Sequence, residues 1–345
     1  MRIRFLEANN FRRFKDVEIS FGEKNAFFGP NASGKTSILE AIYMLCWGKS
    51  FRTLRDSETI RWGENSGYIR GEFEGEDFLN IRVSLLPSSK RIQINGKNAT
   101  RMSLIGKIPV FFLSPEELSM LDGPPKMRRD FLNKVLSQLD KDYLSNYRLY
   151  LKLLREKNAA LSKGGRAIRV VEIINERLLK VSLYIWESRR KLLSYLSDDE
   201  MKIVYKPSGM RIEIALDSVK KALHGLVDKE IKRGYALFGP HLDDFDVLRE
   251  GGFSYRRFAS RGERKWVIWR IFSKIIGLFE KRERLPIFLV DEILSELDGV
   301  KANAVMEEMS AIRAQVFFTT LNKEHVRGDF RAFEVKDGEI REYNR

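Results

Sequence analysis

The sequence predicts an α/β protein made of two lobes, with a helical arm inserted between them. Both ends of the chain alternate short apolar strands with helices, whereas the middle keeps apolar residues at three- and four-residue spacing. A phosphate-loop pattern lies between a strand and a helix near the N-terminus, which is typical of P-loop nucleotide-binding folds. At 345 residues, the chain is long enough for two domains or one large domain with an insertion.

Strand patterns dominate the first lobe, residues 1–116. Short apolar stretches bounded by turn residues predict strands at residues 2–8, 16–21, 25–28, 68–74, 78–85, 91–94 and 108–113. A loop over residues 9–15 separates the first two strands, and Asn95-Gly96 predicts a tight hairpin turn. We therefore expect a lobe rich in antiparallel pairing.

Helices dominate the second segment, residues 117–228. Ser114-Pro115 followed by two glutamates is typical of a helix start. The apolar spacing predicts helices over residues 126–161 and 167–196, broken by the loop 162–165. We expect these helices to form an antiparallel arm.

The third segment, residues 229–345, returns to a mixed pattern. We expect a helix that begins near Asp217 and ends near Arg233, a hairpin at Gly251-Gly252 and a long helix from Ser260. Strands follow at residues 286–290 and 314–318, and Asp337-Gly338 closes the chain with a hairpin.

The charge favours a polyanionic partner. The chain has 62 Lys and Arg against 48 Asp and Glu, a net charge of +14. Residues 117–228 hold 22 basic and 15 acidic residues, so the arm carries half of the excess. Nucleic acid is the first candidate partner, and a solvated surface with a basic bias is the alternative.

Several classes of protein are excluded by composition. No apolar run reaches the roughly 18 residues of a membrane-spanning helix. Charges at Arg2, Arg4 and Glu7 occupy the place of a signal peptide's apolar core, so we expect a cytoplasmic chain. The single cysteine, Cys46, permits no intramolecular disulfide and argues against zinc.

The phosphate-loop pattern G-x4-G-K-[ST] spans residues 29–36, after an apolar strand and before a helix. Backbone N–H groups and the helix macrodipole converge on a phosphate in such a loop, Lys35 adds a positive charge, and Thr36 offers a hydroxyl to Mg2+. We expect side chains at Gly29 and Gly34 to block the ligand. The candidate nucleotide-binding residues are Gly29, Pro30, Asn31, Ala32, Ser33, Gly34, Lys35, Thr36 and Ser37.

The second half of such a site is an apolar strand that ends in a carboxylate. Residues 286–292 provide one that ends in Asp291-Glu292. Asp291 is the candidate Mg2+ ligand, and Glu292 is the candidate that orients or deprotonates the attacking water.

The start of the long helix has two interpretations. Ser260 and Glu263 fit an ordinary capping box, in which each side chain satisfies an N–H group of the first turn. The same N–H groups, with the small Gly262 beside them, could instead meet a phosphate brought by another molecule.

Together these motifs resemble the ABC-type ATPase heads of the SMC/Rad50 group. Their order is a phosphate loop, a distant S-x-G-E helix start, and a carboxylate strand followed by Ser295-Glu296-Leu297-Asp298. Within the group the chain resembles the RecF family, because family motifs recur along most of its length. They are Asn10-Phe11-Arg12, Gly48-Lys49-Ser50-Phe51-Arg52-Thr53 with Asp56, Ser114-Pro115-Glu116-Glu117-Leu118, Gly123-Pro124 with Arg128-Arg129, and Gly239-Pro240-His241-Leu242-Asp243-Asp244.

The resemblance implies an ABC-type ATPase head with an inserted arm. ATP and Mg2+ bound at one subunit would be capped by the signature Ser260, Arg261, Gly262 and Glu263 of a second subunit. Nucleotide would then drive homodimerisation, and slow hydrolysis would separate the pair. Arg12 would also reach the phosphates, and the D-loop residues Ser295 and Asp298 would lie at the dimer seam.

The family resemblance also implies partners. The RecF family binds gapped or double-stranded DNA and works with RecO and RecR to load recombinase in DNA replication, repair, recombination and the SOS response. Cations of the arm are candidates for the DNA contact, with ordinary solvated helix faces as the alternative. These candidates are Lys126, Arg128, Arg129, Arg148, Lys152 and Arg155.

Some residues depart from the family pattern, and for His241 the pattern gives no role. Ala32 replaces a glycine usual in the loop, at a small expected cost, and Arg261-Gly262-Glu263 stands in place of a glutamine-rich stretch. We expect His241 to be satisfied by a neighbouring carboxylate. Other SMC/Rad50-like heads, a transporter-type ATPase subunit and a scaffold that does not hydrolyse ATP are the alternatives.

Overall fold

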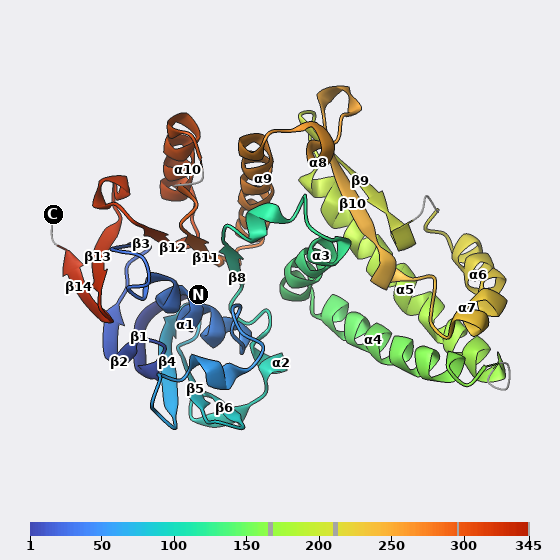
Figure 1. The fold of residues 1–345 in the computed structure, drawn as a ribbon, viewed down its shortest axis with the longest axis horizontal. Coiled ribbons are helices and arrows are strands. Elements are labelled where there is room, and N and C mark those ends of the chain that lie inside the picture. The colour runs from blue at the N-terminus through green and yellow to red at the C-terminus, as the bar shows by residue number, and fades with distance from the viewer. Residues whose placement is uncertain (165–167, 210–212, 295–296, 344–345) are drawn as a thin grey trace. The chain divides into compact units, whose positions relative to one another are not determined.

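The computed structural model describes residues 1–164, 168–209, 213–294 and 297–343 (Figure 1). The chain forms two compact units: Met1–Leu118 with Lys265–Arg345, and Ser119–Arg264. The first boundary lies close to the expected one. Residues 229–264, expected with the C-terminal lobe, belong to the second unit instead, because a strand within them pairs with a strand of the arm.

An antiparallel sheet forms one layer of the first unit. Its strand order is β2 (Phe14–Ser20), β1 (Arg2–Phe11), β4 (Gly67–Glu74), β5 (Leu79–Leu85), β6 (Lys90–Ile94) and β7 (Lys97–Ala99). Asn95 and Gly96 both have positive φ and make the predicted hairpin turn between β6 and β7. The expected loop 9–15 is much shorter, since Phe11 already pairs with Phe14.

The second sheet of this unit is parallel except at one edge. Its order is β14 (Glu339–Tyr343), β13 (Arg331–Lys336), β3 (Lys24–Phe28), β12 (Gln315–Thr320), β11 (Ile287–Asp291) and β8 (Val110–Leu113). Only β14 is antiparallel, through the predicted Asp337-Gly338 hairpin. Strands β11 and β12 are buried along their whole length, which explains their continuous apolar sequences.

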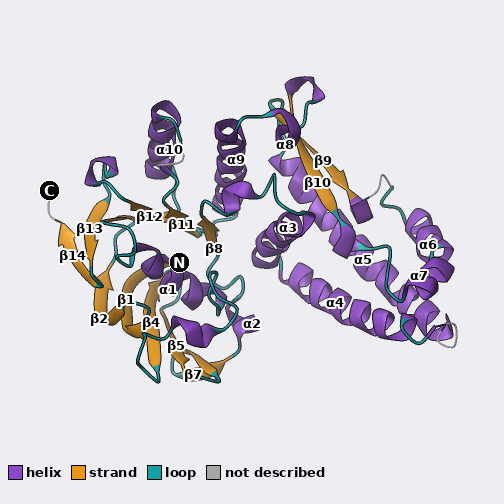
Figure 2. Ribbon diagram, in the orientation of Figure 1, coloured by secondary structure: helices purple, strands orange, loops and turns teal. Residues whose placement is uncertain are grey.

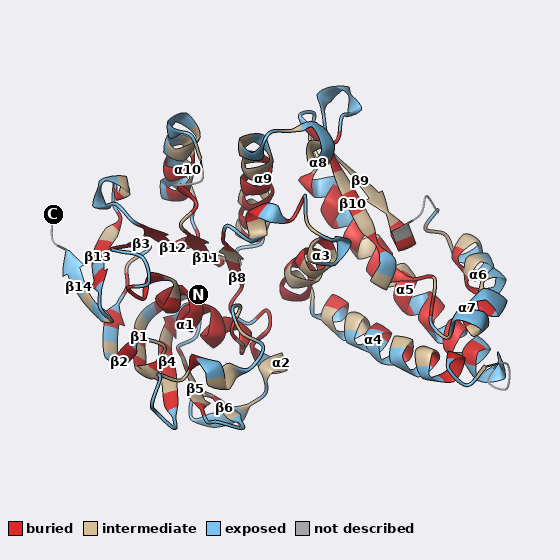
Figure 3. Cartoon of the chain, in the orientation of Figure 1, coloured by how far each residue is buried: buried red, intermediate tan, exposed pale blue. Residues whose placement is uncertain are grey.

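The position of helix α1 (Lys35–Trp47) between two sheets explains its apolar sequence. It contacts β4 and β5 of the first sheet and β8, β11 and β12 of the second. Every residue of α1 except Thr36 is buried, and the helix is red along its length in Figure 3. A helix packed between two sheets has no solvent face, so it carries no polar stripe.

The other face of the second sheet is covered by α9 (Arg261–Glu280) and α10 (Gly299–Ala311), as Figure 1 shows. Trp269 and Phe272 of α9 pack their rings against Phe288 of β11. The Trp269 indole N–H also donates to Glu308 of α10 at 2.7 Å. Neither α10 nor the short helix α2 (Arg101–Leu104) was predicted from the sequence.

The second unit is mainly helical (Figure 2). Its helices are α3 (Pro125–Leu139), α4 (Lys141–Leu161), α5 (Ile168–Leu196), α6 (Leu216–Gly225), α7 (Val227–Arg233) and α8 (Tyr255–Phe258). The helix predicted over residues 126–161 is interrupted at Asp140, whose carboxylate caps α4 by accepting from the Asp142 N–H. The helix predicted over residues 217–233 is likewise two helices.

One small sheet in this unit was missed. Strand β9 (Met201–Lys206) pairs antiparallel with β10 (Asp244–Arg249), and the predicted turn at Gly251-Gly252 follows β10. This pairing draws residues 244–249 to the arm. Within the part of the chain that the structure describes, no helix combines the length and apolarity needed to cross a membrane.

Candidate functional site

The phosphate loop joins β3 to α1 at the carboxyl end of the parallel sheet. Gly29 and Gly34 have φ of 150° and 120°. A Cβ at Gly29 would lie 2.1 Å from the Val335 carbonyl oxygen, and one at Gly34 would lie 3.0 Å from the Phe14 ring. A side chain at either position would therefore collide with neighbouring atoms of the protein. The sequence analysis instead expected a side chain there to block the ligand.

Ala32 adopts a left-handed backbone conformation, with φ of 59°. An L-residue with a Cβ pays about 1 kcal/mol or more in this region, whereas glycine does not. The cost of replacing the usual glycine is therefore one of backbone conformation, not of side-chain size. Ala32 lies on the exposed crest of the loop, next to the exposed Asn31.

The first turn of α1 fits an anion. Gly34 stands at its N-cap, no side chain caps the helix, and no acidic residue lies in the first turn. Ser33 Oγ is buried and has no hydrogen-bond partner among the described residues. Helix N–H groups without a cap, together with a buried hydroxyl, make a cradle that a phosphate would satisfy.

Lys35 is buried at the base of this cradle. Its ammonium donates to the carbonyl oxygens of Gly29 and Pro30, each at 2.9 Å. It also pairs with Glu292 Oε1 at 3.2 Å. The loop thus holds the ammonium in place, and the ion pair joins the two motifs that lie more than two hundred residues apart in sequence.

Thr36 and Asp291, the two candidate Mg2+ ligands, lie in contact. The Thr36 hydroxyl lies 3.1 Å from each carboxylate oxygen of Asp291, which is the last residue of β11. Burial raises the pKa of Asp291 above its ordinary value, and hydrogen bonds from Thr319 and Thr36 oppose that rise. A hydroxyl and a carboxylate at one point are the hard oxygen ligands that Mg2+ prefers, so the residues fit this ion.

Glu292 follows β11 in a left-handed conformation, with φ of 50°. Its backbone N–H donates to the Thr319 hydroxyl at 3.0 Å, and its side chain is one-third exposed. This turn sends the Asp291 carboxylate to Thr36 and the Glu292 carboxylate to Lys35.

Arg12 contacts a carboxylate that the sequence analysis did not single out. Its guanidinium donates to Glu40 of α1 at 2.8 and 2.6 Å and to the Glu58 carbonyl oxygen at 2.8 Å. Glu40 is fully buried and also accepts from the Ser50 hydroxyl at 2.5 Å. Arg12 therefore anchors the loop after α1 to the phosphate helix, and its expected contact with phosphates stays a prediction.

The helix start at Ser260 forms the capping box. The Ser260 N–H donates to Glu263 Oε2 at 2.7 Å, and the Glu263 N–H donates to Ser260 Oγ at 3.2 Å. Ser260, Arg261 and Glu263 are exposed, and Gly262 is half-buried. A capped helix start that is open to solvent is compatible with both interpretations made from the sequence.

Asp298 caps α10, since its carboxylate accepts from the Lys301 N–H at 3.0 Å and pairs with the Lys301 ammonium at 2.8 Å. These contacts lower its pKa below the ordinary value. The side chain is exposed. The other D-loop residue, Ser295, lies outside the described residues.

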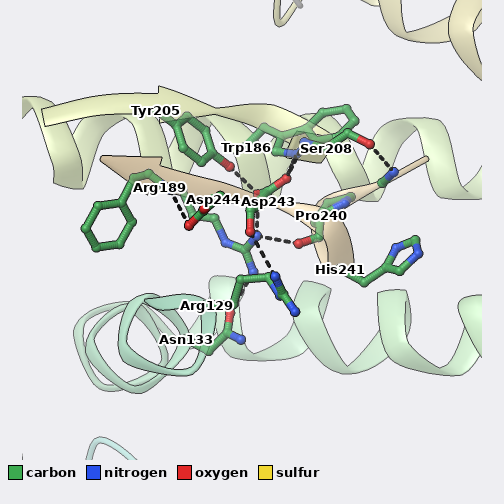
Figure 4. Close-up of polar contacts among 12 residues, drawn as sticks. Arg129, Asn133, Trp186, Arg189, Tyr205, Ser208, Pro240, His241, Asp243 and Asp244 are labelled. Carbon is green, nitrogen blue, oxygen red and sulfur yellow. Dashed lines mark hydrogen bonds and ion pairs between the residues drawn. The ribbon is translucent and has the colours of Figure 1, made fainter. Parts of the chain in front are cut away.

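Asp243 is the hub of a buried network in the second unit (Figure 4). Trp186 Nε1 and the Ser208 N–H donate to it at 2.8 and 2.7 Å. The guanidinium of Arg189 and the hydroxyl of Tyr205 also donate to it. Each carboxylate oxygen of Asp243 thus accepts two hydrogen bonds from the protein, so the role of Asp243 is structural.

His241 is satisfied differently from our expectation of a carboxylate partner. Its Nδ1 lies 2.5 Å from the Tyr150 hydroxyl, and its Nε2 lies 3.4 Å from the Ala236 carbonyl oxygen. Burial lowers the pKa of His241 to about 4. The ring is therefore neutral at pH 7.

The candidate DNA residues separate into two groups. Arg128 is fully buried, donates to three backbone carbonyl groups and pairs with Asp244 at 2.6 Å. Arg128 does not belong to an exposed stripe of cations, because its guanidinium is paired and hydrogen-bonded inside the second unit. Arg129 is half-buried and donates to the Asp243 carbonyl oxygen at 3.0 Å. The exposed members are Lys126, Arg148, Lys152 and Arg155.

Fold and site together define a class of protein. A parallel sheet carries the phosphate loop and the carboxylate strand side by side, an antiparallel sheet covers the phosphate helix, and a helical unit is inserted between the motifs. This arrangement is the P-loop ATPase head of the ABC type.

Comparison with known proteins gives the family. The family model described as the RecF/RecN/SMC N terminal domain matches residues 2–340, and the chain belongs to this family. The chain is 31% identical to the DNA replication and repair protein RecF of Clostridium tetani, over 98% of this chain and 99% of that protein. It is 30% identical to the protein of the same name in a Geobacter species, over 99% and 100%.

Solved structures agree with the sequence comparison. A structure of the recombination mediator protein RecF with ATP, described in the RecFOR pathway, matches with a TM-score of 0.88 and 26% identity, over 99% of this chain and 97% of that one. An SMC head bound to a domain of ScpA matches with a TM-score of 0.57 and 17% identity, which shows the fold alone. The predictions of a RecF-like ABC-type ATPase with a role in DNA replication and repair are thereby confirmed.

Proposed function

We propose that this chain is an ATP-dependent dimerising switch that holds DNA and separates after slow hydrolysis. One observation carries the proposal. Lys35 and Thr36 of the phosphate loop lie within 3.2 Å of Glu292 and Asp291 at the end of β11. A phosphate-binding motif and a carboxylate pair in contact form the minimal apparatus for phosphoryl transfer to water.

ATP is the proposed nucleotide. The uncapped first turn of α1, the buried hydroxyl of Ser33 and the ammonium of Lys35 supply donors and positive charge for its phosphates. The RecF structure determined with ATP, similar over nearly the whole chain, supports the same choice. A phosphate that reaches Lys35 competes with Glu292 for the ammonium.

Thr36 and Asp291 are the proposed Mg2+ ligands, because their oxygens already lie 3.1 Å apart. When bound, Mg2+ neutralises charge on the outer phosphates. The chain's own contribution is to hold the Asp291 carboxylate in a buried position through two hydroxyl groups. Glu292 orients the attacking water and accepts its proton.

Dimerisation is proposed through the signature in trans. Ser260, Arg261 and Glu263 are exposed at a helix start, and the capping box engages the N–H groups of Ser260 and Glu263. The N–H groups of Arg261 and Gly262, which the box does not engage, are the proposed contacts for a phosphate held by a second copy. Asp298 would lie at the same seam. The dimer persists while nucleotide contacts both copies, which is a population shift set by differential binding.

DNA is the proposed ligand of the dimer. The net charge of +14 and the exposed cations Arg148, Lys152 and Arg155, spaced along one side of α4, support this assignment. We propose gapped duplex or a single-strand to double-strand junction as the target, and RecO- and RecR-like proteins as partners, since the matched RecF structure is described in the RecFOR pathway. A cytoplasmic location follows from these partners.

The enzymatic step is tested by steady-state ATPase assays of wild type, Lys35→Met and Glu292→Gln. We expect Lys35→Met to lose ATP binding and Glu292→Gln to bind ATP but hydrolyse it at least a hundredfold more slowly. Glu283→Gln is the matched control, because Glu283 is an exposed glutamate that also has a positive φ of 56°. Equal turnover of Glu292→Gln and wild type would favour a scaffold in which ATP is only a dimerisation ligand.

A further inference from the structure

Thr319 lies between the two carboxylates of the site without belonging to either sequence motif. It is on β12, directly opposite Asp291 in the parallel pairing with β11. The side chain is 1% exposed. Its hydroxyl donates to Asp291 Oδ1 at 2.6 Å and accepts from the Glu292 backbone N–H at 3.0 Å.

Each of these hydrogen bonds constrains a different group. The bond to Asp291 fixes the rotation of the carboxylate, which leaves its oxygens within 3.1 Å of the Thr36 hydroxyl. The bond from Glu292 holds a backbone that has turned into the left-handed region, where a residue with a Cβ is strained. One hydroxyl therefore stabilises both the metal-facing carboxylate and the strained turn behind it.

We propose that Thr319 is a positioning residue for the hydrolytic site, whose hydroxyl aligns Asp291 for Mg2+ and fixes the turn that presents Glu292. The proposal rests on the function proposed above. Partners that orient a metal ligand in this way typically change metal affinity or activity by about 10- to 100-fold when they are lost. A threonine is suited to the role because a hydroxyl donates and accepts at the same time.

The neighbouring residue provides a matched control. Thr320 is also buried and on β12, but its hydroxyl lies 2.9 Å from His325 Nδ1 and makes no hydrogen bond to Asp291 or Glu292 among the described contacts. Removal of the Thr320 hydroxyl changes a buried threonine of the same strand and leaves the carboxylates untouched. Thr319→Ser keeps the hydroxyl and removes only the methyl group.

The test measures ATP affinity by equilibrium dialysis, once with Mg2+ and once with EDTA, together with kcat and KM. For Thr319→Val we expect the ATP affinity in EDTA to equal that of wild type. The increase in ATP affinity that Mg2+ causes should be about tenfold smaller than in wild type, and kcat should fall by about 10- to 100-fold. Thr319→Ser should restore most of both quantities. Thr320→Val should resemble wild type in both.

Three outcomes would overturn the positioning role. They are a Thr319→Val variant with normal Mg2+ dependence and kcat, a Thr319→Ser variant as impaired as the valine variant, and an equal loss in Thr320→Val. Failure of the proposed function looks different, because wild type itself would then bind no ATP or hydrolyse none. Urea unfolding of each variant separates a local effect from general instability.

Discussion

The guanidinium of Arg12 donates to both carboxylate oxygens of Glu40, at 2.8 and 2.6 Å. Glu40 is fully buried on the helix that begins at Lys35, and Arg12 directly follows β1 with a positive φ of 56°. The pair therefore connects the turn between β1 and β2 to the phosphate helix. An arginine fork on a carboxylate fixes both position and orientation.

Glu40→Gln should destabilise the first unit by about 3 kcal/mol, because the half-buried guanidinium of Arg12 loses its charged partner. The measurement is the free energy of unfolding in urea. Glu18→Gln, at an exposed glutamate of β2, is the control and should stay within about 0.5 kcal/mol of wild type. A Glu40→Gln variant as stable as Glu18→Gln would show that the pair contributes little.

Ala32→Gly should stabilise the protein by about 1 kcal/mol, because glycine adopts φ of 59° without strain. Ala159→Gly, at an exposed position inside α4, should change stability in the opposite direction by about the same amount. Thermal unfolding of both variants checks the signs. Two destabilised variants would contradict the left-handed conformation at Ala32.

The low pKa of His241 predicts a pH-dependent loss of stability. The folded pKa of about 4 lies below the ordinary value of 6.5, so the unfolded chain binds the proton first as the pH falls. The neutral ring's contribution is fully present above about pH 6.5 and is lost between there and pH 4. This loss is on the order of 3 kcal/mol.

His241→Gln isolates this effect from other titrations, because the side chain cannot gain a proton. Urea unfolding of both proteins at pH 7.5, 6 and 5 should show a steeper decline for wild type. Parallel declines would mean that His241 titrates normally in the folded protein.

Loss of Arg148 should weaken DNA binding, whereas loss of Arg128 should lower stability. Arg148→Ala removes an exposed cation, so DNA affinity should fall and the slope of log affinity against log salt should lessen by about 1. Arg128→Ala should instead destabilise the second unit by about 3 kcal/mol, since Asp244 and three carbonyl groups lose their partner. Fluorescence anisotropy at several salt concentrations, beside urea unfolding, distinguishes them.

The features that the sequence predicted are those encoded locally. The loop around Lys35 and the strand ending at Asp291 each have a short pattern whose chemistry requires those residues, and their contact follows from the parallel sheet. The Asp140 cap between α3 and α4 is also a local signal, an aspartate before a helix, but the prediction of one helix over residues 126–161 missed it.

The features that it missed depend on pairing between distant segments. Nothing near Glu40 shows that Arg12, 28 residues earlier, would bind it. Strand β9 was missed because its partner β10 lies some forty residues further along the chain, beyond two helices. Thr319 was missed, since its role depends on the register of β12 against β11.

The central claim is that ATP joins two copies into a DNA-holding dimer. Analytical ultracentrifugation of the protein with and without ATP and Mg2+, each with and without labelled gapped duplex, tests it most directly. We predict monomers without nucleotide, dimers that carry the DNA with ATP and Mg2+, and no dimer for Lys35→Met or Ser260→Arg. Monomers of the wild-type protein in every condition would contradict the account, and a Ser260→Arg dimer would return that serine to a plain helix cap.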